Sequence, residues 1–148
     1  MSDERLSAQW ATVRCAVLGL AILAVIPIAL FGLDVRMLFE AWWGQILAGA
    51  AVVLVLSWFG APTVLQRVQK DSKSWSPVSF AILTFLAGAV AGCVLNLALA
   101  YDAVHRGSTT SYLLKPLFWL AAIGVPWAAF VGLILGRMLQ KIAWRSAV

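Results

Sequence analysis

The chain has 148 residues, of which 63% are hydrophobic and 11% are charged, whereas about a quarter of the residues in a typical soluble domain carry charge. Its formal net charge is +5. This balance excludes an ordinary water-soluble domain and indicates a protein that lies mainly in lipid.

The first stretch without a charged side chain covers residues 15–33, and it is long enough to cross a bilayer. Arg5 and Arg14 precede it, as basic residues precede the core of a secretory signal. However, the apolar core exceeds the ~7–15 residues of such a signal, and no small-x-small cleavage site follows. We therefore expect an uncleaved anchor that spans about residues 11–33. Pro27 interrupts this span, and we interpret it as a fixed kink rather than a hinge or an ion-facing carbonyl.

The second charge-free stretch covers residues 41–66 and predicts a span at about residues 41–60. The segment that follows, residues 61–76, contains Pro62 near its start and several amide and charged side chains. Because proline is favoured in the first turn of a helix, we expect a short, separate helix here that lies in the membrane interface.

The third span, at about residues 77–101, carries a regular pattern of small and polar residues. They recur at every fourth position: Thr84, Gly88, Gly92 and Asn96. Spacing by four places them along one face of a helix, where glycines allow another helix to come close. We predict a helix-packing face. The alternative for Asn96 is a substrate or ion ligand, but an interhelical hydrogen bond of ~0.6 kcal/mol explains this residue without one.

The fourth span, at about residues 116–137, has a similar stripe. Its members are also four apart: Gly124, Ala128, Gly132 and Gly136. We expect the two stripes to face each other, so that the third and fourth spans pack closely; an oligomer contact or a cofactor contact is the alternative. Pro126 is interpreted as a kink like Pro27. Trp127 is predicted near mid-membrane, unlike the other tryptophans, which fall near span ends.

Basic residues are concentrated on one side of the predicted membrane. The two termini and the loop between the second and third spans carry the whole net charge, whereas the charges of the other two loops cancel. The positive-inside rule then predicts that both termini face the cytoplasm. Contacts with anionic lipids are expected for Arg67, Lys70, Lys73, Arg137, Lys141 and Arg145. Orientation alone accounts for this distribution, and no recognition motif accompanies it, so nucleic-acid binding is not expected.

Few residues could carry chemistry. Cys15 and Cys93 are predicted ~15–20 Å apart in depth, beyond the ~7 Å between the Cα atoms of a disulfide. His105 is the single histidine, and it cannot form a two-histidine haem site or a zinc site alone. No Asp, Glu, Lys or Arg lies well inside a span, which argues against a proton-coupled carrier. We expect no enzymatic activity, no metal and no cofactor.

The sequence predicts an all-α integral membrane protein, with four transmembrane helices in two antiparallel hairpins that form a single membrane domain over residues 1–148. We expect a non-catalytic subunit of the cell inner membrane that stabilises or positions partners in a larger complex. Its partners would be membrane lipids and other integral membrane subunits or further copies of the chain. The alternative is a small homo-oligomeric channel or carrier lined by Asn96 and Thr84. A lipid-modifying enzyme comes third, because no cluster of acid, base and nucleophile is present.

Overall fold

The computed structural model describes residues 2–31, 35–71, 75–99 and 114–145. These residues contain no strand and form four long helices: α1 (Ser2–Phe31), α2 (Val35–Lys70), α3 (Ser76–Leu99) and α5 (Lys115–Arg145). Each includes a segment that is long and apolar enough to cross a membrane: Asp3–Val25, Gly44–Lys70, Ser76–Leu99 and Leu120–Trp144. The predicted all-α architecture with four spans is confirmed, and the chain is a multi-pass membrane protein.

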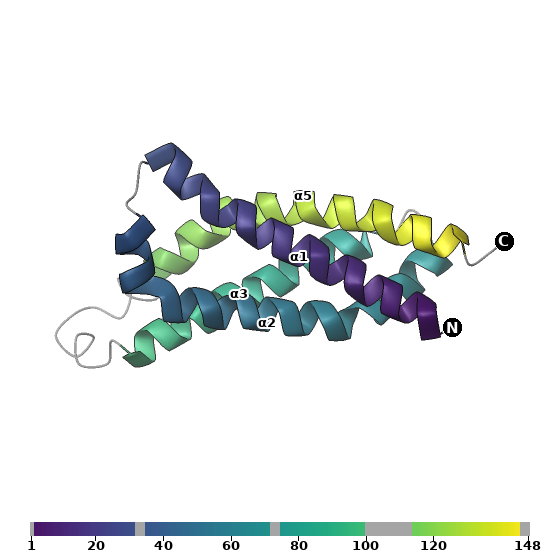
Figure 1. The fold of residues 1–148 in the computed structure, drawn as a ribbon, viewed down its shortest axis with the longest axis horizontal. Helices are drawn as coiled ribbons and strands as arrows, with labels where there is room; N and C mark the ends of the chain where they lie inside the picture. The colour runs from purple at the N-terminus through teal and green to yellow at the C-terminus, as the bar shows by residue number, and fades with distance from the viewer. Residues whose placement is uncertain (1, 32–34, 72–74, 100–113, 146–148) are drawn as a thin grey trace.

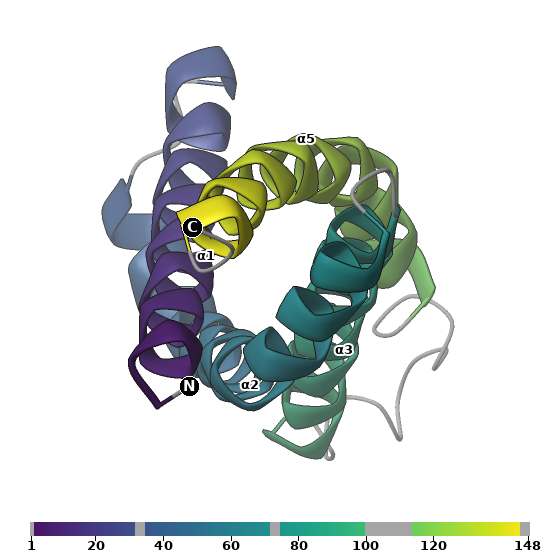
Figure 2. The same ribbon diagram turned by 90° about the vertical axis from the view of Figure 1, so that its right-hand side faces the viewer.

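The helices form a closed ring in chain order, and each runs antiparallel to its neighbours (Figures 1 and 2). Both termini therefore lie at one end of the bundle. The most extensive helix contact joins α2 to α3, followed by the contact between α3 and α5. The two predicted hairpins are thus held together by a larger contact than the one within the first hairpin, α1 with α2.

Helix α2 continues through Pro62 to Lys70 without a break, so the separate interfacial helix expected after residue 60 is instead the end of the second span. Proline lacks an N–H and leaves the carbonyl four residues earlier, at Trp58, without its helical donor. Gln9 of α1 supplies another: its Nε2 donates to the Trp58 carbonyl oxygen at 3.4 Å. A side chain of the neighbouring helix therefore satisfies the carbonyl that Pro62 leaves free, and the helix continues.

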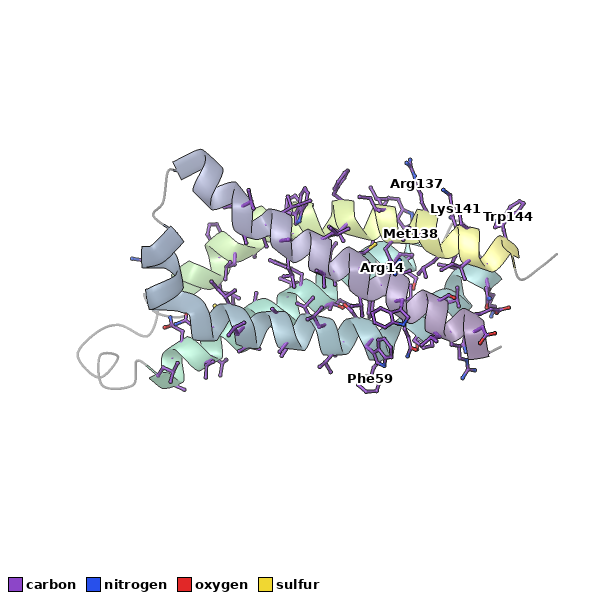
Figure 3. The ribbon with its side chains drawn as sticks, in the orientation of Figure 1. Arg14, Phe59, Arg137, Met138, Lys141 and Trp144 are labelled. Carbon is purple, nitrogen blue, oxygen red and sulfur yellow. The ribbon has the colours of Figure 1, made fainter. Side chains whose placement is uncertain are left out.

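We call the end of the bundle that carries both chain termini the basic end. Here α1, α2 and α5 pack around a cluster of buried side chains: Ala8, Cys15, Val64, Leu65, Val68, Leu135 and Leu139. Leu139 is 0% exposed. Arg137 and Lys141, in contrast, point away from the bundle (Figure 3). The interior of this end is therefore aliphatic, and its charged side chains lie on the outer face.

Candidate functional site

The helix-packing face predicted on α3 lies against α2. A Cβ atom added to Gly88 would lie 2.7 Å from the Gly49 carbonyl oxygen and 2.6 Å from Cγ2 of Val53. A Cβ on Gly49 would in turn lie 2.9 Å from the Gly88 carbonyl oxygen. Any side chain at either glycine would therefore force the two backbones apart. Gly92 is equally close to α2, since its added Cβ would lie 2.9 Å from the carbonyl oxygen of Gln45.

We call this contact the α2–α3 seam; it consists of Gln45, Gly49 and Val53 on α2 and Gly88, Gly92 and Asn96 on α3. A hydrogen bond closes its far end, where Gln45 Nε2 donates to Asn96 Oδ1 at 2.7 Å. Asn96 lies three residues before the end of α3, so the pair sits toward the end of the span rather than at mid-membrane. Oε1 of Gln45 is buried without a hydrogen-bond partner. Asn96, which we singled out in the sequence, thus accepts a hydrogen bond from Gln45 across the seam.

The stripe on α5 packs against a different face of α3. Gly124 lies under the ring of Phe85, and Gly132 faces the backbone of the first turn of α3, where its added Cβ would lie 2.6 Å from Cα of Val78. Gly136 lies beside Pro77. Helices α3 and α5 do pack together, but the glycines of the two stripes do not face each other as we expected. A period of four identifies a packing face, yet it does not identify the helix that the face will meet.

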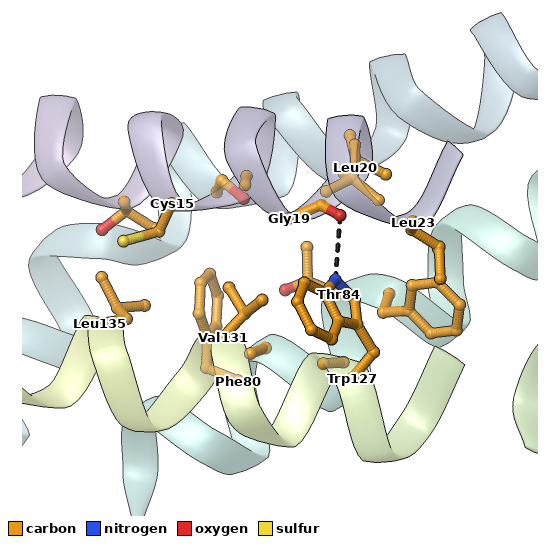
Figure 4. A pocket seen from close by; sticks show the side chains of 16 residues that line it. Cys15, Gly19, Leu20, Leu23, Phe80, Thr84, Trp127, Val131 and Leu135 are labelled. Carbon is orange, nitrogen blue, oxygen red and sulfur yellow. Dashed lines mark hydrogen bonds between the residues drawn. The ribbon is translucent and has the colours of Figure 1, made fainter. Parts of the chain in front are cut away.

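Trp127 connects α5 to α1 near the middle of the bundle. Its Nε1 donates to the carbonyl oxygen of Gly19 at 3.0 Å (Figure 4). Gly19 also lies against Val131, whose Cγ2 would be 3.1 Å from an added Cβ. The small residue therefore allows the indole ring and the branched side chain to approach the α1 backbone. A tryptophan well inside the span is satisfied in this way without water.

A small cavity of about 60 Å³ lies between the four helices (Figure 4). Its walls are mostly apolar and include the rings of Phe80, Phe85 and Trp127. Ala128 of the α5 stripe lines it, as do the hydroxyl-bearing side chains of Ser57 and Thr84. One water needs ~10–15 Å³ of such space, so the cavity has room for roughly four to six waters, whereas a benzene-binding cavity measures ~150 Å³. The site is too small for a drug-sized substrate.

The two cysteines are both buried free thiols on different helices. Sγ of Cys15 lies 3.4 Å from Sδ of Met138, which is a weak contact within the core of the basic end. Among the described residues, no group of three histidine, cysteine, aspartate or glutamate side chains is placed to hold a metal ion. His105 lies outside the described residues.

The predicted lipid-contact residues lie together at the basic end where the structure describes them. Arg67 and Lys70 are exposed on the last turns of α2, and Arg137 and Lys141 are exposed on α5. Lys73 and the side chain of Arg145 are outside the described part of the chain. Four bases on two helices thus surround one end of the bundle.

No family model, curated protein or solved structure matches the chain. Its class therefore follows from the fold alone, which is a four-helix, multi-pass membrane bundle. Sequence reasoning missed the α2 side of the seam. Gln45, Gly49 and Val53 are also spaced by four, but only one of them is a glycine, so the pattern is weaker than on α3.

Proposed function

We propose that the chain is a non-catalytic membrane subunit that packs against larger partners and stabilises or positions them. The observation that supports this proposal is that the internal polar side chains bond one helix to another. The amides of Gln45 and Gln9 and the indole of Trp127 each donate a hydrogen bond to a neighbouring helix. These groups hold the helices together, and they do not converge on a cavity that could accept a substrate. Such a bundle supplies a stable shape rather than a reactive centre.

The partner would contact the outer surface, because the small-residue stripes are occupied within the bundle. Every helix presents large apolar side chains outward, and one prominent example on each is Leu18, Phe59, Leu83 and Phe130. Lipid chains cover such side chains in an isolated bundle. A partner helix would replace lipid through van der Waals packing, since lipid and leucine are about equally apolar.

The proposed location is the bacterial inner membrane, with both termini in the cytoplasm. The supporting observation is that both termini lie at the end of the bundle where α2 ends (Figure 1), and that Arg137 and Lys141 of α5 are exposed at this same end (Figure 3). Arg67 and Lys70 are exposed in the last turns of α2. Cytoplasmic segments retain arginine and lysine, so this end is assigned to the cytoplasm.

Photo-crosslinking in native membranes tests the proposal. A photoreactive amino acid would replace Leu18, Phe59, Leu83 or Phe130 in turn, with buried Leu139 as the negative control position. We expect one or two adjacent outer positions to crosslink to the same membrane protein and position 139 to give no product. The proposal fails if all four positions label only lipid and the purified chain conducts solute by itself in liposomes.

A small homo-oligomeric channel or carrier is the second candidate, and the cavity between the four helices favours it. Ser57 and Thr84 bring hydroxyl groups to that cavity from α2 and α3. For this function, liposomes containing only the purified chain should release a small solute, and Thr84→Val should lower the rate. Absence of flux from a correctly assembled oligomer would reject it.

A further inference from the structure

A groove of about 260 Å³ lies between α2 and α3 near the basic end, on the outside of the bundle. Four residues of each helix line it: Gly60, Thr63, Val64 and Arg67 of α2, and Ser76, Ser79, Phe80 and Leu83 of α3. Most of these are exposed or partly exposed, whereas Val64 is buried and forms the floor. The groove is therefore open to the surrounding lipid.

Its lining changes from polar to apolar along the helix axes. Arg67 and Ser76 lie toward the basic end, Thr63 and Ser79 come one turn further in, and Leu83 lies deepest. The ring of Phe80 lies against Gly60, where a Cβ atom would overlap it. Because Gly60 has no side chain, the ring of Phe80 comes directly against the α2 backbone at the groove.

The change in polarity falls where the hydrocarbon layer should end. About 20 helical residues cross the ~30 Å of hydrocarbon. Counted from Ala41, where the charge-free stretch of α2 begins, they end near residue 60; counted back from Tyr101, the last residue before Asp102, they end near residue 82. Arg67, Ser76 and Ser79 then lie at headgroup depth, and Leu83 lies in the hydrocarbon.

We propose that this groove binds one anionic phospholipid, with its phosphate held by Arg67 and the hydroxyl groups of Thr63 and Ser79 and an acyl chain lying along Leu83. A guanidinium forms paired hydrogen bonds with phosphate oxygens, and hydroxyl groups add single donors. Arg67 is exposed on α2 and lines the groove. Lys70, one turn further along α2, adds positive charge, while Asp71 beside it offsets only one of the two bases.

The test measures lipid retained by the protein purified in mild detergent, by native mass spectrometry with phosphatidylglycerol added. Arg67→Gln should weaken binding about fivefold, which corresponds to about 1 kcal/mol for one base near the headgroups. Ser79→Ala should weaken it about threefold through loss of one hydroxyl donor. Arg137→Gln is the matched control, because this exposed base lies on α5 outside the groove, and it should change binding less than twofold.

Three outcomes would overturn the proposal. An equal loss of lipid binding in the Arg137→Gln variant would mean that the lipid is attracted to the whole basic end and not to the groove. Equal retention of phosphatidylcholine would remove the preference for anionic lipid. Displacement of the lipid by inorganic phosphate at the same concentration would identify a soluble phosphate ligand instead. Because Arg67 and Ser79 are both exposed, the thermal stability of the lipid-free variants should match that of the parent chain, which separates lost binding from lost folding.

Discussion

The core of the basic end and the α2–α3 seam hold the same bundle together in opposite ways. At the basic end, aliphatic side chains such as Val64 and Leu139 fill the space between helices. In the seam, Gly49 and Gly88 have no side chains, so the two helix backbones come into direct contact. Both regions lie within the candidate spans. In the first, large side chains make the contacts through many dispersion interactions. In the second, the backbones approach closely and one hydrogen bond is added, as is usual for helices that associate within lipid.

Removing atoms should damage the first region most. Leu139→Ala deletes methylene and methyl groups from a side chain that is 0% exposed, so we expect a loss of about 3 kcal/mol in the free energy of unfolding. Reversible unfolding in mixed micelles, followed by circular dichroism, would measure it. Leu133→Ala, on the lipid-facing side of the same helix, should cost less than about 1 kcal/mol, because it leaves no internal cavity. Equal losses would contradict our distinction between the two regions.

Adding one carbon atom should damage the second region. Gly88→Ala places a methyl group 2.7 Å from the Gly49 carbonyl oxygen, and we expect it to destabilise the bundle by about 2 kcal/mol. Gly44→Ala is the control on α2, since the nearest atom to its added Cβ is 4.0 Å away. This control should be neutral or slightly stabilising, because alanine has the higher helix propensity. If both alanine variants are neutral in the same unfolding assay, close backbone contact does not stabilise the seam.

A smaller effect is expected from the polar pair at the end of the seam. Gln45→Met and Asn96→Leu each remove one partner of the 2.7 Å hydrogen bond. In a double-mutant cycle the coupling energy should be about 0.6 kcal/mol, the average for such bonds in membranes. The unsatisfied Oε1 of Gln45 should make Gln45→Met the milder single substitution, because it also removes a buried acceptor without a donor. A coupling near zero would show that the bond adds nothing to assembly.

The number, order and class of the spans could be predicted, because stretches without charge must be long to cross lipid and are easy to recognise. The faces that pack could also be located, since Gly88 and Gly92 repeat with the helical period. The helix that such a face contacts could not be predicted, because a stripe of small residues can pack against any helix in the bundle. Gly88 meets Val53 as well as Gly49, and nothing in the pattern on α3 distinguishes that surface from the glycines of α5.

The course of α2 after residue 60 was the clearest error, and it too has a physical cause. A proline inside a helix normally ends or bends it, because one hydrogen bond is lost. Here the compensating donor is Gln9, which is 49 residues from Trp58 in the sequence. A local pattern does offer one correct signal: Val64, Leu65 and Val68 are spaced as one apolar helical face, and all three are buried.

The unbroken course of α2 has a mechanical consequence. Its candidate span, Gly44–Lys70, has 27 residues and corresponds to about 40 Å of helix, which exceeds the ~30 Å thickness of the hydrocarbon layer and favours tilt or projection beyond it. The same span carries Gly49 in the seam and Leu65 in the aliphatic core. A change in bilayer thickness that alters its tilt would therefore act on both regions together.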